Sequence, residues 1–243
     1  MSQKPSSTIE DYLMEIYDMG RAGRAVIAAR LTEKMGVSAP TVWNTVHRME
    51  RDGLVAIDGS KEITLSPLGL EAAESIKRRH LLTERLLVDN LGLDWADAHE
   101  EAHLIEHTIT PRVEARIMAT LGNPTTCPHG NPMPGLDPAT RPQTRPLSTA
   151  KPGDERVIDG INEPAEEDHE LMTFYQRHGF LPGARLKVLD VASYNATITV
   201  DIEGRHVTLG MSAAENLRIV VEAAHSAAEQ RAERRQQRSS ART

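Results

Sequence analysis

The sequence predicts a mainly α-helical protein with a small β-rich domain toward its C-terminal end. Apolar residues recur at helical spacing through most of residues 8–121. A stretch rich in proline and glycine follows, and four short β-prone runs come after it with one helical segment among them. The expected domains, linker and disordered basic tail are, in chain order, 1–66, 67–140, 141–152 (linker), 153–222 and 223–243 (tail).

Composition limits the possible functions. The 243 residues are 39% apolar and carry a formal net charge of −7. A chain with this charge is not a uniformly basic histone-like protein, so any nucleic-acid contact must come from a local patch. A single cysteine, Cys127, suits a reducing compartment. The polar N-terminus lacks a signal peptide and no apolar run reaches transmembrane length, so we expect a cytoplasmic protein without membrane contact.

The first 66 residues have the element order of a winged helix-turn-helix. Gly36 makes a tight turn between the second and third helices, and Ser38 is a good N-cap for the third. Two β-prone runs then flank Asp58-Gly59, where a hairpin turn of two or more residues is expected. The expected helices and strand-like runs are 8–19, 27–35, 38–52, 54–57 and 62–65.

The third helix has an apolar stripe and an opposite polar face that is suited to DNA. Asn can read an adenine edge, Pro can contact a thymine methyl group, and Ser, Thr, Arg and Lys can hold phosphates. Trp43 either buttresses the helix or packs on sugar and methyl groups. The alternative is a winged helix used only for protein contacts. The candidate DNA-contacting residues are Ser38, Pro40, Thr41, Trp43, Asn44, Arg48 and, at the tip of the wing, Lys61.

The rest of the chain changes from helices to strands. A long helix is expected at 67–90, and one or two helices at 95–121 with a break at Pro111. The later β-prone runs suggest a small barrel. These runs, with the helix among them, are 157–158, 169–178 (helix), 185–191, 196–202 and 206–209.

Histidine and glutamate recur on the helical segments at spacings that suit a metal. Positions i, i+4, i+7 and i+8 of a helix lie on one side of it. Imidazole and carboxylate groups arranged in this way bind borderline and harder divalent ions. The plainer alternative is a solvated polar face that happens to be rich in histidine. The residues are His99, His103, Glu106 and His107 on one helix, and His80 and Glu84 on the preceding one.

Four segments, taken together, resemble the diphtheria toxin repressor family of metal-dependent repressors, which includes iron-dependent regulators and manganese transport regulators. The resemblance runs almost without gaps from Thr8 to Leu136 and continues more weakly through a C-terminal SH3-like (FeoA-like) module. It is specific because the DNA and metal motifs occur in order and at the family's spacing. The segments are Thr-Val-Trp-Asn-Thr-Val-His-Arg-Met-Glu-Arg-Asp-Gly-Leu-Val, Arg-His-Leu-Leu-Thr-Glu-Arg-Leu-Leu, His-Glu-Glu-Ala-His-Leu-Ile-Glu-His and Gly-Asn-Pro-Met-Pro-Gly.

The resemblance implies a homodimeric repressor of metal homeostasis genes that binds double-stranded operator DNA when loaded with metal. The dimer contacts would lie in the helices of 67–140. A metal that joins the first helix to the dimerisation domain would set the spacing of the two recognition helices. The implied primary site is Asp11, His103, Glu106 and His107, and the implied ancillary site is His80, Glu84 and His99 completed by Glu163 and Glu166.

Departures from the family pattern bear on the choice of metal. Iron-sensing members have Met and Cys where this chain has Asp11 and His103. The harder ligands favour Mn(II), with Fe(II) second, and Co(II), Ni(II) or Zn(II) as ions that could bind in vitro. A manganese-regulator subgroup has a Glu one turn after the Asp, where this chain has Met14.

A metal-dependent repressor is not an enzyme, and three features of the sequence suggest other functions. Residues 103–107 match the H-x-x-E-H signature of inverted zinc peptidases, a weak pattern by itself. A winged-helix regulator with an organic effector or a protein partner is a second alternative. The SH3-like module could bind a proline-rich peptide, including the chain's own 132–146. Cys127 and His129 are expected to be structural, because no second ligand pair accompanies them.

Overall fold

The computed structural model describes residues 5–221 of the chain. The basic tail expected at 223–243 therefore lies outside the described residues. The described residues fall into two compact units, which are 5–127 with 132–136, and 128–131 with 137–221.

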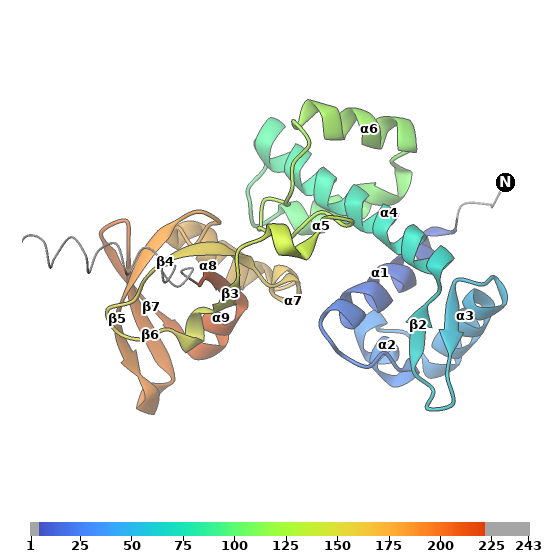
Figure 1. The fold of residues 1–243 in the computed structure, drawn as a ribbon, viewed down its shortest axis with the longest axis horizontal. Coiled ribbons are helices and arrows are strands. Elements are labelled where there is room, and N and C mark those ends of the chain that lie inside the picture. The colour runs from blue at the N-terminus through green and yellow to red at the C-terminus, as the bar shows by residue number, and fades with distance from the viewer. Residues whose placement is uncertain (1–4, 222–243) are drawn as a thin grey trace, which may run out of the picture. The chain divides into compact units, whose positions relative to one another are not determined.

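The first unit begins with the predicted winged helix-turn-helix (Figure 1). Its core consists of buried residues such as Leu13, Leu31 and Met49. The wing is an antiparallel pair whose connection, 58–62, is longer than a two-residue turn. Its elements are α1 (Ser7–Arg21), α2 (Ala28–Met35), α3 (Ala39–Arg51), β1 (Val55–Ile57) and β2 (Ile63–Leu65).

A helical layer follows, and its longest helix packs against α1. Gly69 allows a close approach of α4 to the wing, because a Cβ atom there would lie 1.9 Å from the Leu54 carbonyl oxygen. The helix expected at 67–90 ends in a π-helical turn, and the helical segment expected at 95–121 changes to a 3-10 turn before its predicted break at Pro111. The elements are α4 (Pro67–Arg85), η1 (Leu86–Asn90), α5 (Ala98–Ile105), η2 (Glu106–Thr108) and α6 (Pro111–Thr120).

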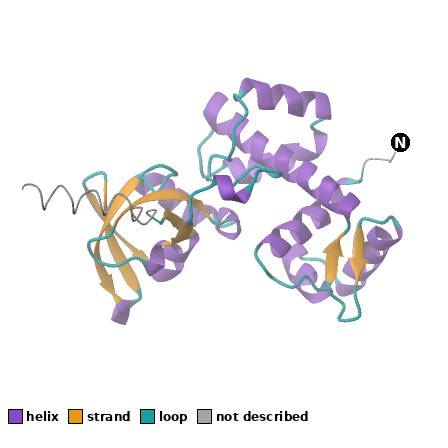
Figure 2. Cartoon of the chain, in the orientation of Figure 1, coloured by secondary structure: helices purple, strands orange, loops and turns teal. Residues whose placement is uncertain are grey.

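The second unit is built on a six-stranded antiparallel sheet in the order β3-β8-β4-β5-β6-β7. Figure 2 distinguishes the strands from the helices and loops by colour. The predicted β-rich domain is thus confirmed, with two more strands than the sequence indicated. The strands are β3 (Thr144–Pro146), β4 (Glu155–Ile161), β5 (Arg185–Ala192), β6 (Thr197–Ile202), β7 (Arg205–Gly210) and β8 (Leu217–Val220). The helical elements are η3 (Pro138–Thr140), η4 (Leu147–Thr149), α7 (Glu163–Glu166), α8 (His169–His178), η5 (Ser193–Asn195) and α9 (Met211–Asn216).

The expected linker at 141–152 needs correction, because much of it is folded. Strand β3 pairs with β8, and η4 follows it directly. Leu147 is fully buried and anchors this segment to the second unit. Pro146 is tolerated because β3 is an edge strand, where a missing N–H disrupts no central ladder. The end of the proline-rich segment 132–146 therefore contributes a strand to the sheet.

Membrane contact was not expected from the sequence. Among residues 5–221, none of the helices combines the length and the apolar character that a bilayer crossing requires.

Candidate metal centre and nucleic-acid interface

Asp11 is carried by α1, on the part of the helix surface that is not packed into the core. The apolar stripe of α1 buries Tyr12, Leu13 and Ile16. The Asp11 side chain retains 28% exposure and reaches the ring of His107, with 2.9 Å between Asp11 Oδ1 and His107 Nε2. A residue of the winged helix is thereby in contact with the helical layer.

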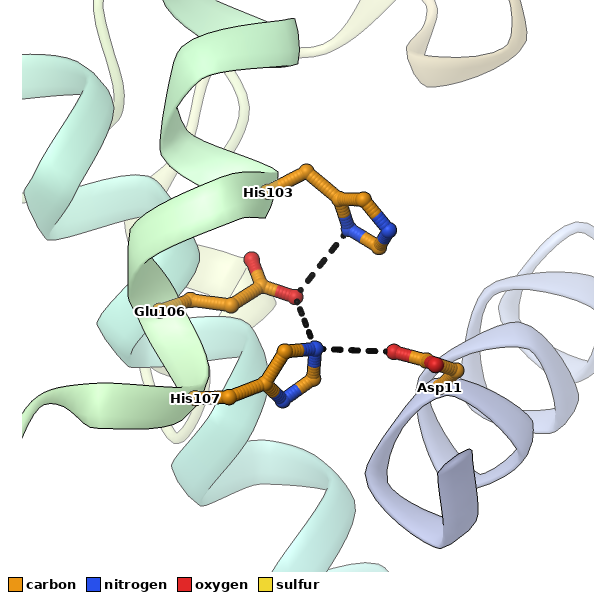
Figure 3. A group of neighbouring side chains, drawn as sticks. All are labelled: Asp11, His103, Glu106 and His107. Atoms are coloured by element: carbon orange, nitrogen blue, oxygen red, sulfur yellow. Dashed lines mark ion pairs between the residues drawn. The ribbon is translucent and has the colours of Figure 1, made fainter. Parts of the chain in front are cut away.

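The other three side chains come from the end of α5 and from η2 (Figure 3). Glu106 Oε1 lies 3.2 Å from His103 Nδ1 and 3.4 Å from His107 Nε2. One ligand atom from each residue can be chosen so that all four atoms lie within 4.8 Å of one another. We call Asp11, His103, Glu106 and His107 the primary cluster.

The donor set of the primary cluster fits a divalent cation. Asp11 Oδ1 and Glu106 Oε1 are shielded from solvent, and neither makes a hydrogen bond of normal geometry. Both oxygens instead lie within ion-pair distance of imidazole nitrogens. Two carboxylates and two imidazoles are ligands that Mn²⁺, Fe²⁺ and Zn²⁺ accept. A cation among them would satisfy oxygens that the protein alone satisfies poorly.

A second group of ligands lies between α4 and α5. His80 Nε2 is 2.9 Å from Glu84 Oε1, which is 3.2 Å from His99 Nδ1. His80 and Glu84 are fully buried, whereas the His99 side chain is 26% exposed. We call these three residues the ancillary cluster. The predicted stripe on one helix thus serves two places, because His99 faces the ancillary cluster and the later residues face the primary one.

His80 connects the two clusters. While its Nε2 faces Glu84, its Nδ1 lies 2.5 Å from Glu106 Oε2. A metal bound at the ancillary cluster would therefore contact the His80 ring, and that ring also contacts Glu106 of the primary cluster.

Glu163 and Glu166, which the family pattern adds to the ancillary site, are the terminal residues of α7 in the second unit. Glu166 is buried there, accepts a hydrogen bond from Asn131 and lies 3.4 Å from His129 Nδ1. Their participation in a metal site stays a prediction. Cys127 belongs to the first unit and packs in an apolar cluster, whereas His129 belongs to the second, and their structural role also stays a prediction.

Electrostatics favours the charged forms of His80, Glu106 and His103. Burial lowers the pKa of His80, but the charge of Glu84 and the hydrogen bond to Glu106 outweigh it and raise the pKa to about 9. Burial raises the pKa of Glu106, yet the adjacent imidazoles of His103 and His80 bring it down to about 2. The adjacent Glu106 carboxylate also raises the pKa of His103. A cation would have to displace these imidazole protons.

Asp11 differs from Glu106 in its titration. Burial raises the pKa of Asp11, although the charges of His107 and His103 oppose this shift. A cation would favour the ionised carboxylate and so reverse the effect of burial.

The recognition helix α3 is placed as predicted. Gly36 adopts a left-handed conformation with φ 63°, and the Ser38 side chain caps α3 by accepting from the Thr41 N–H. Val42 and Met49 face the core. The expected DNA-contacting residues of this helix are all exposed: Ser38, Pro40, Thr41, Trp43, Asn44 and Arg48.

Trp43 and the wing tip have distinct environments. Trp43 is 58% exposed, and its ring lies 4.0 Å from that of His47 in an edge-on arrangement. Trp43, Asn44 and Arg48 line one shallow surface hollow. Lys61 lies in the wing loop with φ 66°, where the Asp58 carboxylate accepts from neighbouring backbone groups. Both positions are accessible to a duplex.

Two residues beside the primary cluster were missed from the sequence. Glu10 precedes Asp11 on α1, and Arg79 precedes His80 on α4, and both are nearly fully buried. In the sequence each of them is a charged residue next to an expected ligand. A charged residue on a helix usually belongs to the solvent-exposed face, so neither position indicated a role at the site.

Family models match nearly the whole described chain. They are described as the iron dependent repressor N-terminal DNA binding domain at residues 4–63, the iron dependent repressor metal binding and dimerisation domain at 66–135, and the FeoA domain at 145–221. The predicted DNA-binding, dimerisation and SH3-like modules are confirmed.

Relatives with curated names cover most of the chain. The iron-dependent repressor IdeR of Mycobacterium tuberculosis is 37% identical over 204 residues, covering 79% of this chain and 88% of its own. The diphtheria toxin repressor of Corynebacterium diphtheriae is 34% identical over 221 residues, with 87% and 96% covered. A solved structure described as a manganese-dependent transcriptional repressor complex with manganese is 34% identical, with TM-score 0.75 and coverage of 87% and 99%.

Proposed function

This chain belongs to the diphtheria toxin repressor family of metal-dependent transcriptional repressors, and we propose that a divalent metal bound by the primary cluster switches on its binding to operator DNA. The observation that carries the proposal is the origin of the ligands. Asp11 comes from the winged helix, whereas Glu106 and His107 come from the helical layer.

The switch works through the position of the winged helix. A cation shared by Asp11 and His107 would hold α1 against η2 and so restrict the orientations of α3, which lies in the same small core as α1. In a dimer, the two recognition helices must match the spacing of two operator half-sites. The metal selects the competent arrangement because its ligands come together only there.

Manganese is the proposed physiological metal, with Fe(II) second. Asp11 and His103 supply oxygen and nitrogen where sulfur ligands would favour softer ions. Met14 lies on α1 without a ligand oxygen to offer, so the proposed manganese site has a single carboxylate from this helix. Relatives named for iron and structures named for manganese both occur, so the proposed preference for manganese rests on the ligands of this chain.

The ancillary cluster is proposed as a second metal site. His80, Glu84 and His99 supply three ligands from α4 and α5. Because His80 also contacts Glu106, occupancy of the ancillary site would help to fix a primary ligand.

The proposed partners are operator DNA and a second copy of the chain, in the cytoplasm. Large apolar side chains are exposed on the helical layer, including Leu91 at 68%, Leu104 at 70% and Val113 at 46%. Exposed apolar side chains favour a protein interface, and these lie within residues 66–135, which match the family model of the metal binding and dimerisation domain.

The family match disfavours the alternative functions that the sequence suggested, a zinc peptidase and a regulator with an organic effector. The family consists of DNA-binding repressors, so the H-x-x-E-H pattern at 103–107 is not a peptidase signature here. A regulator with an organic effector has no support from the matched models.

Fluorescence anisotropy tests the proposal. The full chain is titrated onto labelled DNA from its own promoter region with manganese, anaerobic ferrous iron, zinc or no metal. We expect tight binding only with metal, and the lowest midpoint for manganese among the metals. Equal binding with chelator present would remove the metal switch, and a lower midpoint for ferrous iron would reverse the order of metals.

A further inference from the structure

Glu10 makes two contacts that point in different directions. Its side chain is 4% exposed and lies beside Asp11 on α1. Glu10 Oε1 accepts from Arg79 Nη2 at 2.7 Å, and Oε2 lies 2.8 Å from Nδ1 of His107. The carboxylate therefore connects a buried cation of α4 to the ring that faces Asp11.

Arg79 is held by the turn that carries the metal ligands. Its Nη1 donates to the carbonyl oxygens of Glu106 and Ile109, at 3.3 and 3.4 Å. A guanidinium has five donors and no acceptor, so whichever Glu10 atom faces Arg79 must be an acceptor. Arg79 thus holds one oxygen of Glu10 in place, while the other oxygen contacts His107.

The contact between Glu10 and His107 favours one position for the ring proton. A carboxylate can only accept, so His107 Nδ1 donates to Glu10. Nε2 also faces carboxylate oxygens, but neither of them makes a hydrogen bond of normal geometry with it. In the neutral ring, Nε2 is then the atom with a free electron pair. That atom faces Asp11 Oδ1 at 2.9 Å and Glu106 Oε1 at 3.4 Å, inside the primary cluster.

We propose that Glu10 is a positioning residue that holds His107 in the tautomer whose Nε2 can bind the metal. The inference rests on the proposed function of the primary cluster. Ligating imidazoles commonly donate their second N–H to a carboxylate, which fixes the tautomer and the ring plane. Here the carboxylate comes from α1, so the winged helix supplies both a ligand, Asp11, and the group that orients another ligand.

Glu10→Gln separates this role from simple neutralisation of Arg79. The amide oxygen can still accept from Arg79, which leaves the NH₂ group facing His107 Nδ1. In the opposite orientation the amide NH₂ group would face the Arg79 N–H, donor against donor, so that orientation is disfavoured. The ring then has to accept at Nδ1 and carry its proton on Nε2, where it blocks the metal.

The first readout needs no metal. Chelator-treated full chain with ¹⁵N-labelled histidine is raised to a pH at which His107 is neutral, and its ring nitrogens are observed by long-range ¹H–¹⁵N NMR, with His107→Gln for assignment. We expect the Nδ1–H tautomer in the wild type and the Nε2–H tautomer in Glu10→Gln. An Nε2–H tautomer in the wild type overturns the proposal, even if the variant does not fold.

The second readout is manganese affinity by calorimetry. We expect Glu10→Gln to weaken binding by about 10–100-fold, the usual cost of losing an outer partner of a metal ligand. The matched control is Glu15→Gln, the same change at a half-buried residue of α1 that belongs to neither cluster, and it should bind as the wild type does. Equal affinity in Glu10→Gln reduces Glu10 to a structural partner of Arg79. A wild type that binds no manganese defeats the proposed function, whereas the tautomer experiment judges Glu10 separately.

Discussion

The two clusters use the same kinds of side chain but differ in which elements supply them. The primary cluster draws Asp11 from α1 and its other members from the end of α5 and η2. The ancillary cluster lies wholly on α4 and α5, two helices of one layer. The primary cluster therefore includes a residue of the winged helix, and the ancillary cluster does not.

The difference extends to burial. His80 and Glu84 of the ancillary cluster are shut off from solvent, whereas Asp11 and His103 of the primary cluster are partly exposed. A buried ion pair is costly to break and tends to stabilise one arrangement. The buried contacts of His80 and Glu84 are thus suited to hold α4 against η2 and α5, whereas Asp11 and His103 leave part of the primary cluster open to solvent.

The largest effect is expected for Asp11→Ala. Removing the one primary ligand on α1 should bring operator affinity in saturating manganese down to the metal-free level, a loss beyond the roughly 10–100-fold of an outer partner. The chain should stay folded, because Asp11 lies outside the buried stripe of α1. Anisotropy measures the affinity, and circular dichroism with size-exclusion chromatography checks the fold. Metal-dependent binding retained at wild-type strength would mean that the primary cluster does not control the winged helix.

A pH-dependent stability is expected from His80. Its pKa rises from 6.5 to about 9 on folding, so its contribution is complete below pH 6.5 and is lost as pH rises through about 9. This corresponds to on the order of 3 kcal/mol at most in the metal-free chain. Urea unfolding across that range should show falling stability, with a flatter profile for His80→Gln. Stability that rises with pH over the same range in the wild type would contradict the charge assigned to His80.

Glu84→Gln tests whether the clusters can be separated. Glu84 contacts His80 and His99 but no member of the primary cluster in the contacts described above. We expect loss of the second metal equivalent in calorimetry, and a shift of roughly tenfold or less in the primary one, transmitted through His80. Loss of all metal-dependent DNA binding, as in Asp11→Ala, would show that the two clusters act as one site.

The smallest effect is expected at Lys61, which belongs to neither cluster. Lys61→Ala should weaken DNA binding several-fold and lower the slope of log affinity against log salt by about 1, as for one lost phosphate contact. The midpoint of the manganese titration should not move. A shifted metal midpoint would contradict the separation of DNA contact from metal sensing.

The sequence predicted what depends on periodicity and missed what depends on close contacts between distant segments. The recognition helix and the stripe of His99, His103 and Glu106 follow from helical spacing, and both are present. The division of that stripe between two clusters was not foreseen, because it depends on where α5 gives way to η2. Whether each of these residues binds metal remains a prediction.

Glu10 and β3 show why the remaining features were missed. A glutamate next to a predicted ligand resembles a solvated residue until Arg79, 69 positions away, is folded against it. Strand β3 is three residues long and ends in proline, so its local signals favour a linker. Its pairing with β8 comes from the far end of the module.

Hydrogen exchange of the full chain, with and without manganese, measures whether one metal joins α1 to the end of α5 and η2. We predict that peptides covering 7–21 and 98–108 gain protection together with one manganese midpoint, and that in Asp11→Ala only 98–108 does so. Protection of 98–108 in the wild type without any change in 7–21 would contradict the account.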